Sequence, residues 1–554
     1  MAAAVGGLSG LPDHLLCRIL YFAPAKEAAS TAVLSRRWRS LWLASGGVNL
    51  DSRSYDRRPH AFSHSMAAAL SAAAAGGEPV RRLTLHVDAT CYEIHFSKAY
   101  STHGGPRHDM AAALLASPAA RAVEELAVVI APRPGFPADR LASRSALSFG
   151  ALPSETLRAL HAANVGCLAA PPPAAAFPRL AELRLRTCGV SIANLQRVVD
   201  AAPQLATLHL DRYSFGERRG HGSETTADGW KNSGGRLVCP AVTDLVLADC
   251  SWPLHEVGKV DLDVPKLEYF RYKGSVRLVM ERVFLKLPAA SPGVVRVDLH
   301  FDQESWRNKR TPEVFWEFLQ SFNTAKVLKL KMDLTTDHVD LAKKHEQDKL
   351  TLTNRLLCKL ERLEVEVPRE PAGETLALFI ANLLRCCPVV RDLHLKLTSK
   401  ASDRAGIEAW SEFDRCIDHF RHHRKSPRFS LNADEDENYV VSDIHFLSDH
   451  SFDCLKSCLR TVILKFWMQG PNCFEVQLAK FFAKNAMVLQ QISIDDGNHR
   501  LRDHMNRMIR KWVPGSSISK NSPITTAFRM SYHRKRQRED GQYLAGDSTR
   551  TCAQ

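Results

Sequence analysis

Three histidines in the run DHFRHHRK, His419, His422 and His423, come closest in this sequence to a metal site. Arginines and a lysine are interleaved with them, and no cysteine cluster accompanies them, so a solvated basic segment is favoured over a zinc site. The carboxylates of Asp495 and Asp496 stand in DDGN, which is typical of a turn after a strand. No phosphate-binding loop, metalloprotease or nucleophile-elbow motif occurs. The sequence therefore predicts no catalytic residue, no metal and no cofactor, and a protein that is not an enzyme.

The fourteen cysteines are thinly spread over 554 residues, and none forms a CxxC pair. The closest groupings are Cys386-Cys387 and Cys454…Cys458, while Cys188 and Cys250 stand in apolar, strand-like runs. This distribution indicates buried, reduced thiols in an intracellular protein rather than a disulfide framework.

The net charge of +14 is concentrated near the ends of the chain. Residues 501–554 hold eleven Lys and Arg against four Asp and Glu, and residues 1–60 hold eight against four, so the body between them is almost neutral. Binding to nucleic acid requires a basic surface on a folded face, which this distribution does not predict. A nucleic-acid-associated protein that uses its basic tail remains an alternative, although we do not expect nucleic acid as a partner.

No segment of the sequence predicts a membrane association. No stretch approaches the roughly 20 apolar residues that cross a bilayer, and the start MAAAVGGLSGLPDHLL lacks the parts of a secretory signal. The run HRKRQR at residues 533–538 fits a nuclear-import peptide, and it fits a merely solvating tail equally well. We expect a protein of the nucleus and/or cytoplasm.

One pattern recurs along the body of the chain: apolar, two variable, apolar, one variable, apolar. It appears thirteen times, as VRRLTL (80–85), VEELAV (123–128), LRALHA (157–162), LAELRL (180–185), LATLHL (205–210), VTDLVL (242–247), LEYFRY (267–272), VVRVDL (294–299), AKVLKL (325–330), LERLEV (360–365), VRDLHL (390–395), LRTVIL (459–464) and LQQISI (489–494). Alternation at the last positions of each unit predicts a strand. Helical spacing follows in stretches such as 191–203.

Most of these units start 23 to 43 residues apart, the spacing of a leucine-rich-repeat solenoid. The pattern resembles irregular plant leucine-rich repeats and predicts an α/β fold with a horseshoe shape. The loose spacing predicts long insertions, which we expect at 212–236, 331–355 and 399–455.

The first 45 residues have a different pattern, that of three short helices. Leu11, Leu15 and Ile19 fall on one helical stripe, Pro24 ends that helix, and Ser35 can cap the helix that contains the two tryptophans of LSRRWRSLW. A second short helix is expected over 26–34. Three helices in about 40 residues cannot bury all their apolar side chains, so some must dock on the adjacent repeats or on another protein.

Residues 8–45, which include LPDHLLCRILYFAPAKEAASTAVLSRRWRSLW, closely resemble the F-box in the form common among plant proteins. The resemblance implies a helical module that binds the Skp-family adaptor of a cullin-RING ubiquitin ligase. Carried over by motif, the adaptor-binding residues are Leu11, Pro12, Leu15, Ile19, Leu20, Leu34, Ser35, Trp38 and Trp42. Some of them, Trp42 in particular, can instead pack inside the module or against the repeats.

Residues 458–494 resemble the FBD region found at the end of many plant F-box proteins, and their pattern is strand, loop, amphipathic helix, strand. The predicted organisation is therefore an F-box at 8–45, a linker or helix at 46–77, irregular repeats at 78–457, an FBD-like end at 458–500 and a disordered basic tail at 513–554.

Within each repeat the apolar side chains face the core, so the residue between them faces the exposed side of the sheet. These positions are candidates for target binding: Arg184, His209, Val246, Arg271, Asp298, Lys329, Glu364, His394, Ile463 and Ser493, flanked by Arg186, Asp211 and Lys396. They have mixed charge, which favours a protein target over a polyanion. The alternative is a merely solvated sheet face.

The resemblance and the repeats together predict a substrate-recognition subunit of a Skp-cullin-F-box ubiquitin ligase. Its repeats would hold an unknown target protein, its F-box would bind the adaptor and through it cullin, and the chain would contribute proximity rather than catalysis. A non-ligase interaction protein that docks the adaptor without modification of any target is the main alternative.

Overall fold

The computed structural model describes residues 8–55, 59–75, 79–88, 108–109, 115, 118–131, 145–165, 167–169, 171–173, 175–189, 191–215, 235–251, 260–275, 283–286, 293–301, 311–332, 357–368, 373–398, 441–448, 450–466, 472–495, 508–509, 511–513 and 529–532. The chain divides into two compact units, Met1–Leu360 and Glu361–Gln554, which are described separately. The expected α/β class is confirmed, since both units combine parallel strands with helices. The horseshoe shape stays a prediction.

Unit 1 begins with three short helices, as predicted. Helix α1 is Asp13–Phe22, α2 is Ala25–Ser30 and continues as the 3-10 turn Thr31–Val33, and α3 is Arg36–Ala44. Pro12 and Pro24 stand directly before α1 and α2, where the missing N–H of proline costs nothing. The Ser35 side chain accepts a hydrogen bond from the Trp38 N–H at 3.4 Å and so caps α3.

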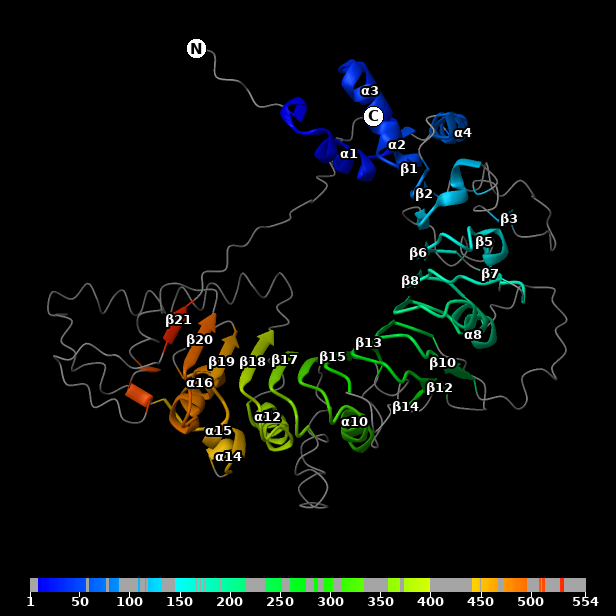
Figure 1. The fold of residues 1–554 in the computed structure, drawn as a ribbon. Helices are drawn as coiled ribbons and strands as arrows, with labels where there is room; N and C mark the ends of the chain where they lie inside the picture. The colour runs from blue at the N-terminus through cyan, green and yellow to red at the C-terminus, as the bar shows by residue number, and fades with distance from the viewer. Residues whose placement is uncertain are drawn as a thin grey trace, which may run out of the picture. The chain divides into compact units, whose positions relative to one another are not determined.

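The main sheet of unit 1 is parallel. Its strands are β1 (Gly47–Asp51), β2 (Arg82–Asp88), β4 (Glu125–Ala131), β6 (Ala159–Ala163), β8 (Glu182–Arg186), β9 (Thr207–Asp211), β11 (Asp244–Ala248), β13 (Tyr269–Gly274), β15 (Arg296–Phe301) and β16 (Val327–Met332), and they follow one another in this order. Figure 1 shows β6 and β8 as successive neighbours in this part of the chain. Each predicted strand lies where its apolar unit predicts it. The alternate leucines are buried, as Leu183 and Leu185 are in β8.

The strands end in a repeated turn that explains two of the buried cysteines. Asn164, Thr187, Arg212 and Asp249 have φ between 49° and 59°, and the N–H of each donates to a carbonyl of the following strand at 2.7–2.8 Å. The thiols of Cys188 and Cys250, each one residue after such a turn, lie 3.5 Å from the carbonyl oxygens of Ala162 and Leu210. Both side chains are buried, as the sequence predicted.

Two features of unit 1 differ from the prediction. Residues 46–77 were expected to form a linker or helix, and they contain helix α4 (Pro59–Ala75). Strand β1 precedes this helix, because Val48 and Leu50 alternate with other residues and pair with β2. Short strands that the sequence did not predict also lie between the main strands. They form two three-stranded parallel sheets, β3 (His108–Asp109), β5 (Ser145–Ser148), β7 (Cys167–Ala169), and β10 (Arg236–Val238), β12 (Val260–Asp263), β14 (Val283–Lys286).

Two helices of unit 1 each follow a main strand. Helix α8 (Ile192–Ala201) confirms the pattern of 191–203, with Leu195, Val198 and Val199 buried and the Ser191 side chain accepting from the Asn194 N–H. Helix α10 (Thr311–Gln320) buries Phe315, and this ring contacts Phe301 at the end of β15 edge to face.

Unit 2 repeats the arrangement with longer helices. Strands β17 (Arg362–Pro368), β18 (Asp392–Thr398), β19 (Thr461–Lys465) and β20 (Gln491–Asp495) pair in parallel and in this order. Helices α12 (Glu374–Cys386), α14 (His445–Ser448), α15 (Asp453–Ser457) and α16 (Phe474–Asn485) lie on one side of these strands (Figure 1). The strand–helix–strand order expected for 458–494 is observed. The expected insertion at 399–455 contains α14 and the start of α15, whereas 399–440 lies outside the described residues, as do 216–234 and 333–355.

The tail differs from the prediction at one point. Residues 529–532 form strand β21 (Arg529–Tyr532), which pairs in parallel with β20, although 513–554 were expected to be disordered. The open backbone groups of β20 supply the physical reason, because an edge strand readily pairs with a further extended segment. Among the described residues, no helix combines the length and the apolar character that a bilayer crossing requires.

Candidate functional site

The three N-terminal helices present an unusual amount of apolar surface. Of the nine large hydrophobic side chains that are exposed among the described residues, six lie between positions 8 and 34. They are Leu8, Leu15, Ile19, Phe22, Val33 and Leu34, with exposed fractions of 62, 42, 44, 51, 88 and 66%. Leu15 and Ile19 are four residues apart on α1 and therefore share one face of that helix. A concentration of this kind marks a protein-binding surface.

The core of this helical module takes up the other apolar side chains. Leu16, Leu20, Ala28, Trp38 and Leu41 form a buried cluster. Because the module is small, this cluster uses side chains from all three helices. Its packing explains why the two tryptophans stand four residues apart, since that spacing places both on the face of α3 that meets α1.

The structure separates the predicted adaptor-binding residues into three groups. Pro12, Leu15, Ile19, Leu34 and Ser35 lie at the surface, and Leu11 and Trp42 are half-buried against the core. Leu20 and Trp38, with 2 and 3% exposure, lie inside the core, so a partner cannot reach them without opening the module. For these two the expectation of direct contact is corrected to a role in holding the module together, as their burial on the inner face dictates.

An arginine fixes the start of α1 against α3. The Arg37 side chain donates from Nε to Asp13 Oδ1 at 2.6 Å and from a terminal nitrogen to the Leu11 carbonyl. Asp13 is the first residue of α1, where a carboxylate also complements the positive end of the helix, and Leu11 lies two residues before it. Arg37 therefore positions the segment that carries Leu11 and Pro12.

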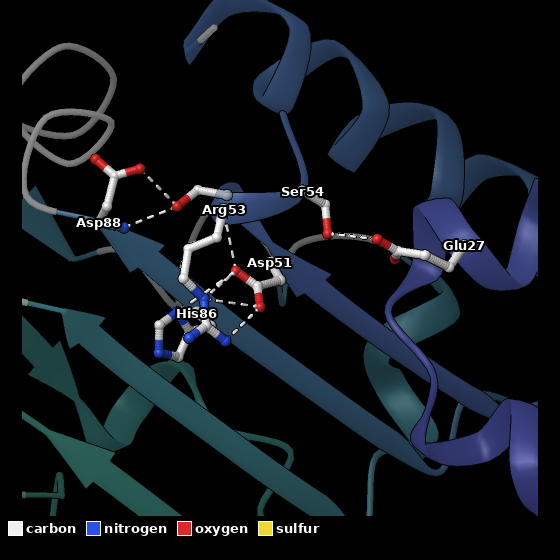
Figure 2. Close-up of polar contacts among 7 residues, drawn as sticks. Glu27, Asp51, Arg53, Ser54, His86 and Asp88 are labelled. Atoms are coloured by element: carbon white, nitrogen blue, oxygen red, sulfur yellow. Dashed lines mark hydrogen bonds and ion pairs between the residues drawn. The ribbon is translucent and has the colours of Figure 1, made fainter. Parts of the chain in front are cut away.

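A polar network joins the helical module to the first strands of the sheet (Figure 2). Ser54, just after β1, donates its hydroxyl to Glu27 Oε1 on α2 at 2.8 Å, and its carbonyl accepts from the Lys26 ammonium. Ser52 is fully buried and donates to Asp88 Oδ2 at the end of β2 at 2.8 Å, while the Asp88 N–H donates back to the Ser52 hydroxyl. The contacts of Ser54 bind α2 to the segment that follows β1, and those of Ser52 bind the same segment to the end of β2.

The centre of this network is an Asp–Arg–His group. Asp51 accepts hydrogen bonds from Arg53 Nη2 at 2.6 Å, from the Arg53 backbone N–H at 2.9 Å, and from Arg53 Nε, whose single N–H is shared by both carboxylate oxygens. His86 Nδ1 lies 3.6 Å from Asp51 Oδ1 (Figure 2). Burial raises the pKa of Asp51, but the hydrogen bonds from Arg53 and the nearby charges outweigh burial and lower that pKa. Burial, and then the Arg53 charge, lower the pKa of His86. The imidazole is therefore neutral at pH 7.

A second set of contacts holds the end of α1 on the sheet. The Asn49 side-chain amide donates to the carbonyls of Tyr21 and Ala23 at 2.8 and 3.0 Å, which satisfies acceptors that a helix C-terminus leaves open. The Arg82 guanidinium lies over the rings of Tyr21 and Phe22, 5.7 and 5.0 Å from their centroids. The module is thus attached to β1 and β2 by contacts from two of its helices.

The exposed face of the unit 1 sheet carries the predicted target-binding positions in one continuous row. The registers align Arg184 of β8 with His209 of β9, and then Val246 of β11, Arg271 of β13, Asp298 of β15 and Lys329 of β16. In unit 2 the registers align Glu364, His394, Ile463 and Ser493. The registers thus place these positions in one row within each unit. The expectation that all of them are exposed is wrong for Val246 and Ser493, which are buried with 8 and 1% exposure. A role in binding for the other positions stays a prediction.

Most charges on these faces are already paired. Arg184 pairs with Glu182 two residues earlier, and Arg186 pairs across strands with Asp211, which also lies 3.7 Å from Arg212. In unit 2, Glu364 pairs with Arg362 at 2.7 Å, and Lys396 pairs with Glu366 at 2.9 Å. Exposed pairs of this kind contribute little stability and can exchange partners.

Sequence reasoning missed four members of the row in unit 1. Asn49, Thr84, Ala127 and His161 continue it from β8 back to β1, and Asn49, Thr84 and His161 are polar. His161 and Thr84 occupy the same offset in LRALHA and VRRLTL that Arg184 has in LAELRL, so the pattern itself contained the signal. For Asn49, the segment GVNLD lacks the first apolar position of the unit and gives only the alternation.

No arrangement among the described residues suggests catalysis. No group of three or more His, Cys, Asp and Glu in that part of the chain could hold a metal ion, and the run 419–423 lies outside it. Asp495 ends β20, and Asp496 is not described. Burial raises the pKa of the Cys188, Cys239, Cys250, Cys386 and Cys454 thiols to about 12. These thiols are therefore protonated and poor nucleophiles.

Comparison with known families identifies two segments. The model of the F-box domain matches residues 8–45, the segment that forms the three-helix module. A model described as "FBD-associated F-box protein At5g56370, LRR repeats" matches residues 111–226, which include strands β4, β6, β8 and β9. The F-box resemblance and the repeat resemblance found in the sequence are both confirmed.

Curated relatives from Arabidopsis thaliana carry the same names. The chain is similar to F-box/FBD/LRR-repeat protein At5g22700, with 47% identity over 49 residues, which are 9% of this chain and 11% of the relative. It is also similar to putative F-box protein At3g44060, with 40% identity over 87 residues, 15 and 20% of the two chains. The alignment with FBD-associated F-box protein At5g60610 has 60% identity over 35 residues, 6 and 9%.

These alignments span a fifth or less of the relatives, so they identify segments and not whole proteins. The names support an FBD relationship, while its location at 458–500 stays a prediction. The chain therefore carries an F-box domain followed by leucine-rich repeats of the FBD-associated type, and its matched relatives are plant F-box proteins.

Proposed function

We propose that this chain is the substrate-recognition subunit of a Skp-cullin-F-box ubiquitin ligase. Its F-box domain binds a Skp-family adaptor and through it cullin, and its repeats bind a target protein. The chain itself performs no catalysis, because the ubiquitin chemistry belongs to partner subunits. The observation that carries the proposal is the apolar surface of the F-box domain, in particular Leu15, Ile19 and Leu34.

The energetics of that surface fit a stable partner. Large apolar side chains that a partner buries in the centre of an interface contribute roughly 2 kcal/mol or more each on truncation. Leu15, Ile19 and Leu34 are held at the surface by the core behind them, which Leu16, Leu20 and Trp38 fill. Such a preorganised surface loses little conformational entropy on binding.

The attachment of the F-box domain to the sheet supports the proposal that the repeats hold a target protein for the ligase. Asn49 and Arg82 contact the end of α1, and Ser54 contacts Lys26 and Glu27 of α2. A subunit that acts by proximity gains from a fixed geometry between adaptor and target, because a rigid connection raises the effective concentration of the target at the reaction site.

Co-purification of cullin tests the proposal against its main alternative. The full-length chain, expressed with a tag in plant cells, should carry both the adaptor and cullin, and a variant with Leu15→Ala and Ile19→Ala should lose both. Recovery of the adaptor without cullin would favour the non-ligase F-box interaction protein instead.

Location in the nucleus and/or cytoplasm is part of the same proposal. Deleting residues 533–538 should reduce nuclear accumulation of a fluorescent fusion if HRKRQR is an import peptide. An unchanged distribution would reject the import role and leave the ligase proposal intact.

A further inference from the structure

The middle row of the unit 1 sheet is the feature that the proposed function leaves without a specific role. From β1 to β13 this row consists of Asn49, Thr84, Ala127, His161, Arg184, His209, Val246 and Arg271. It contains two arginines and two histidines but no carboxylate. The first acidic member is Asp298 of β15, which accepts from Tyr269 and pairs with Arg296.

The basic side chains of this row are accessible. Arg184 is half exposed, and its ion pair with Glu182 is also at the surface, where competition from another carboxylate is easy. Arg271 is exposed, and among the described residues no ion pair or hydrogen bond involves its side chain. The two arginines are separated along the row by His209 and Val246.

The two histidines flank Arg184 on the neighbouring strands. His161 of β6 faces Arg184, Arg186 and Glu182 of β8, while its other neighbour in the row is Ala127 of β4. Burial and then the Arg184 charge lower the pKa of His161.

His209 of β9 has Arg184 on one side and Val246 on the other. Asp211 of its own strand, Arg271 and His161 also act on it. Burial and then the Arg184 charge lower its pKa, so both imidazoles are neutral at pH 7 when nothing lies over them.

Unit 2 offers a contrast. There the middle row begins with Glu364, whose carboxylate pairs with Arg362 and lies 3.9 Å from His394 Nδ1, and it continues with the apolar Ile463. The anionic partner of the histidine is thus built into the unit 2 face. In unit 1 the row itself places Arg184, and no carboxylate, between the two histidines, while Glu182 and Asp211 act on them from flanking positions of β8 and β9.

We propose that the row His161, Arg184, His209 and Arg271 binds an acidic segment of the target protein, with an Asp or Glu carboxylate over Arg184 between the two imidazoles and proton uptake by the imidazoles on binding. Charge complementarity carries this assignment, since the row presents cationic and protonatable groups without an acidic member. As a statement about the target it rests on the proposed function, whereas the binding of an acidic peptide does not.

The test uses the full-length chain and a fluorescein-labelled octaglutamate peptide, with octaglutamine as the uncharged reference, in fluorescence anisotropy titrations at 150 mM NaCl. Arg184→Glu combined with Arg271→Glu should weaken octaglutamate binding at least about tenfold. The matched control is Arg236→Glu, because Arg236 is also about half exposed and ion-paired, with Asp263, but lies on the separate β10 sheet. It should change the affinity less than about twofold. Equal losses in both variants would overturn the proposal and assign the binding to net charge.

The pH dependence tests the histidines. A carboxylate beside the imidazoles raises their pKa, so affinity increases as the pH falls below the ordinary value of about 6.5. Binding should be about tenfold tighter at pH 5.5 than at pH 7.5, where glutamate carboxylates stay ionised. His161→Gln with His209→Gln should abolish most of this increase, whereas His14→Gln on the exposed side of α1 should keep it. An unchanged increase in the double variant would overturn the histidine part.

Failure of this inference and failure of the proposed function give different results. If the row does not bind acidic segments, octaglutamate binding is insensitive to Arg184 and Arg271 while adaptor binding persists. If the F-box does not bind the adaptor, the peptide titrations still give the row-specific losses.

Discussion

Gly47 is the position where a single methyl group should loosen the F-box domain from the repeats. A Cβ at Gly47 would lie 2.4 Å from the Tyr21 carbonyl oxygen and 2.9 Å from the Tyr21 Cα. Both atoms belong to the backbone at the end of α1, so no side-chain rotation relieves the clash. An ordinary contact needs roughly 3.4 Å or more, and α1 must therefore move by about 1 Å.

The energetic cost follows from what that movement disturbs. Overpacking costs about 1–3 kcal/mol, and the hydrogen bonds from Asn49 to the Tyr21 and Ala23 carbonyls are worth about 1 kcal/mol each. We therefore expect Gly47→Ala to lower the free energy of local opening by about 2–5 kcal/mol. The adjacent Arg82 contacts with Tyr21 and Phe22 weaken as well.

Hydrogen exchange measured by mass spectrometry gives a local readout. Amides of residues 19–24 and 47–51 should exchange at least about 30-fold faster in Gly47→Ala, the factor that corresponds to 2 kcal/mol. The matched control is Gly10→Ala, since an added Cβ there meets nothing within 4 Å. Unchanged protection in Gly47→Ala, or an equal loss in Gly10→Ala, would refute the reasoning.

Two further predictions concern the cysteines and the tail. Burial raises the pKa of the Cys188, Cys239 and Cys250 thiols to about 12, so at pH 8 only about one in ten thousand of them is a thiolate. Iodoacetamide at pH 8 should therefore label the exposed Cys358 and leave these three cysteines unmodified. The same pKa shifts should lower the free energy of unfolding as the pH rises above about 9, because the unfolded chain loses these protons first. Early labelling of Cys250 in mass spectra would contradict the assignment of these thiols as buried and protonated. Deleting residues 533–554 should leave thermal unfolding unchanged. Deleting residues 529–554 also removes β21 and should speed amide exchange in β20. Equal exchange in the two truncated chains would show that β21 does not protect β20.

The parts of the fold that repeat were predictable from the sequence. The pattern of each LxxLxL unit predicts which side chains are buried. Leu183, Leu208 and Leu245 have the same offset in their units, and they align across β8, β9 and β11. Helix α8 was predictable because its apolar spacing and the capping Ser191 agree. The offset that predicted Arg184 and His209 as exposed neighbours also contained His161.

Features that depend on the tertiary partner were not predictable. The strands of the two small sheets have two to four residues, too few for periodicity to distinguish from loops. Strand β1 lacks the first apolar position of the repeated unit. Leu20 lies on α1, whose exposed face also carries the apolar Leu15 and Ile19, so only the packing shows which residues are internal. The apolar stripe of α3 likewise does not show whether Trp38 meets the core or a partner. The shared offset aligns Arg186 with Asp211, but the ion pair between them depends on the side-chain conformations, which the pattern does not specify.

The most direct test of the central claim is the affinity of the full-length chain for a purified plant Skp-family adaptor, measured by isothermal titration calorimetry. Leu15→Ala combined with Ile19→Ala should weaken binding at least about tenfold, because both side chains lie exposed on one face of α1. Val295→Ala is the matched control, since Val295 is 43% exposed and lies outside the F-box domain, and its affinity should equal that of the unmodified chain. Unchanged adaptor affinity in the double variant, with the helical module still folded by circular dichroism, would contradict the account.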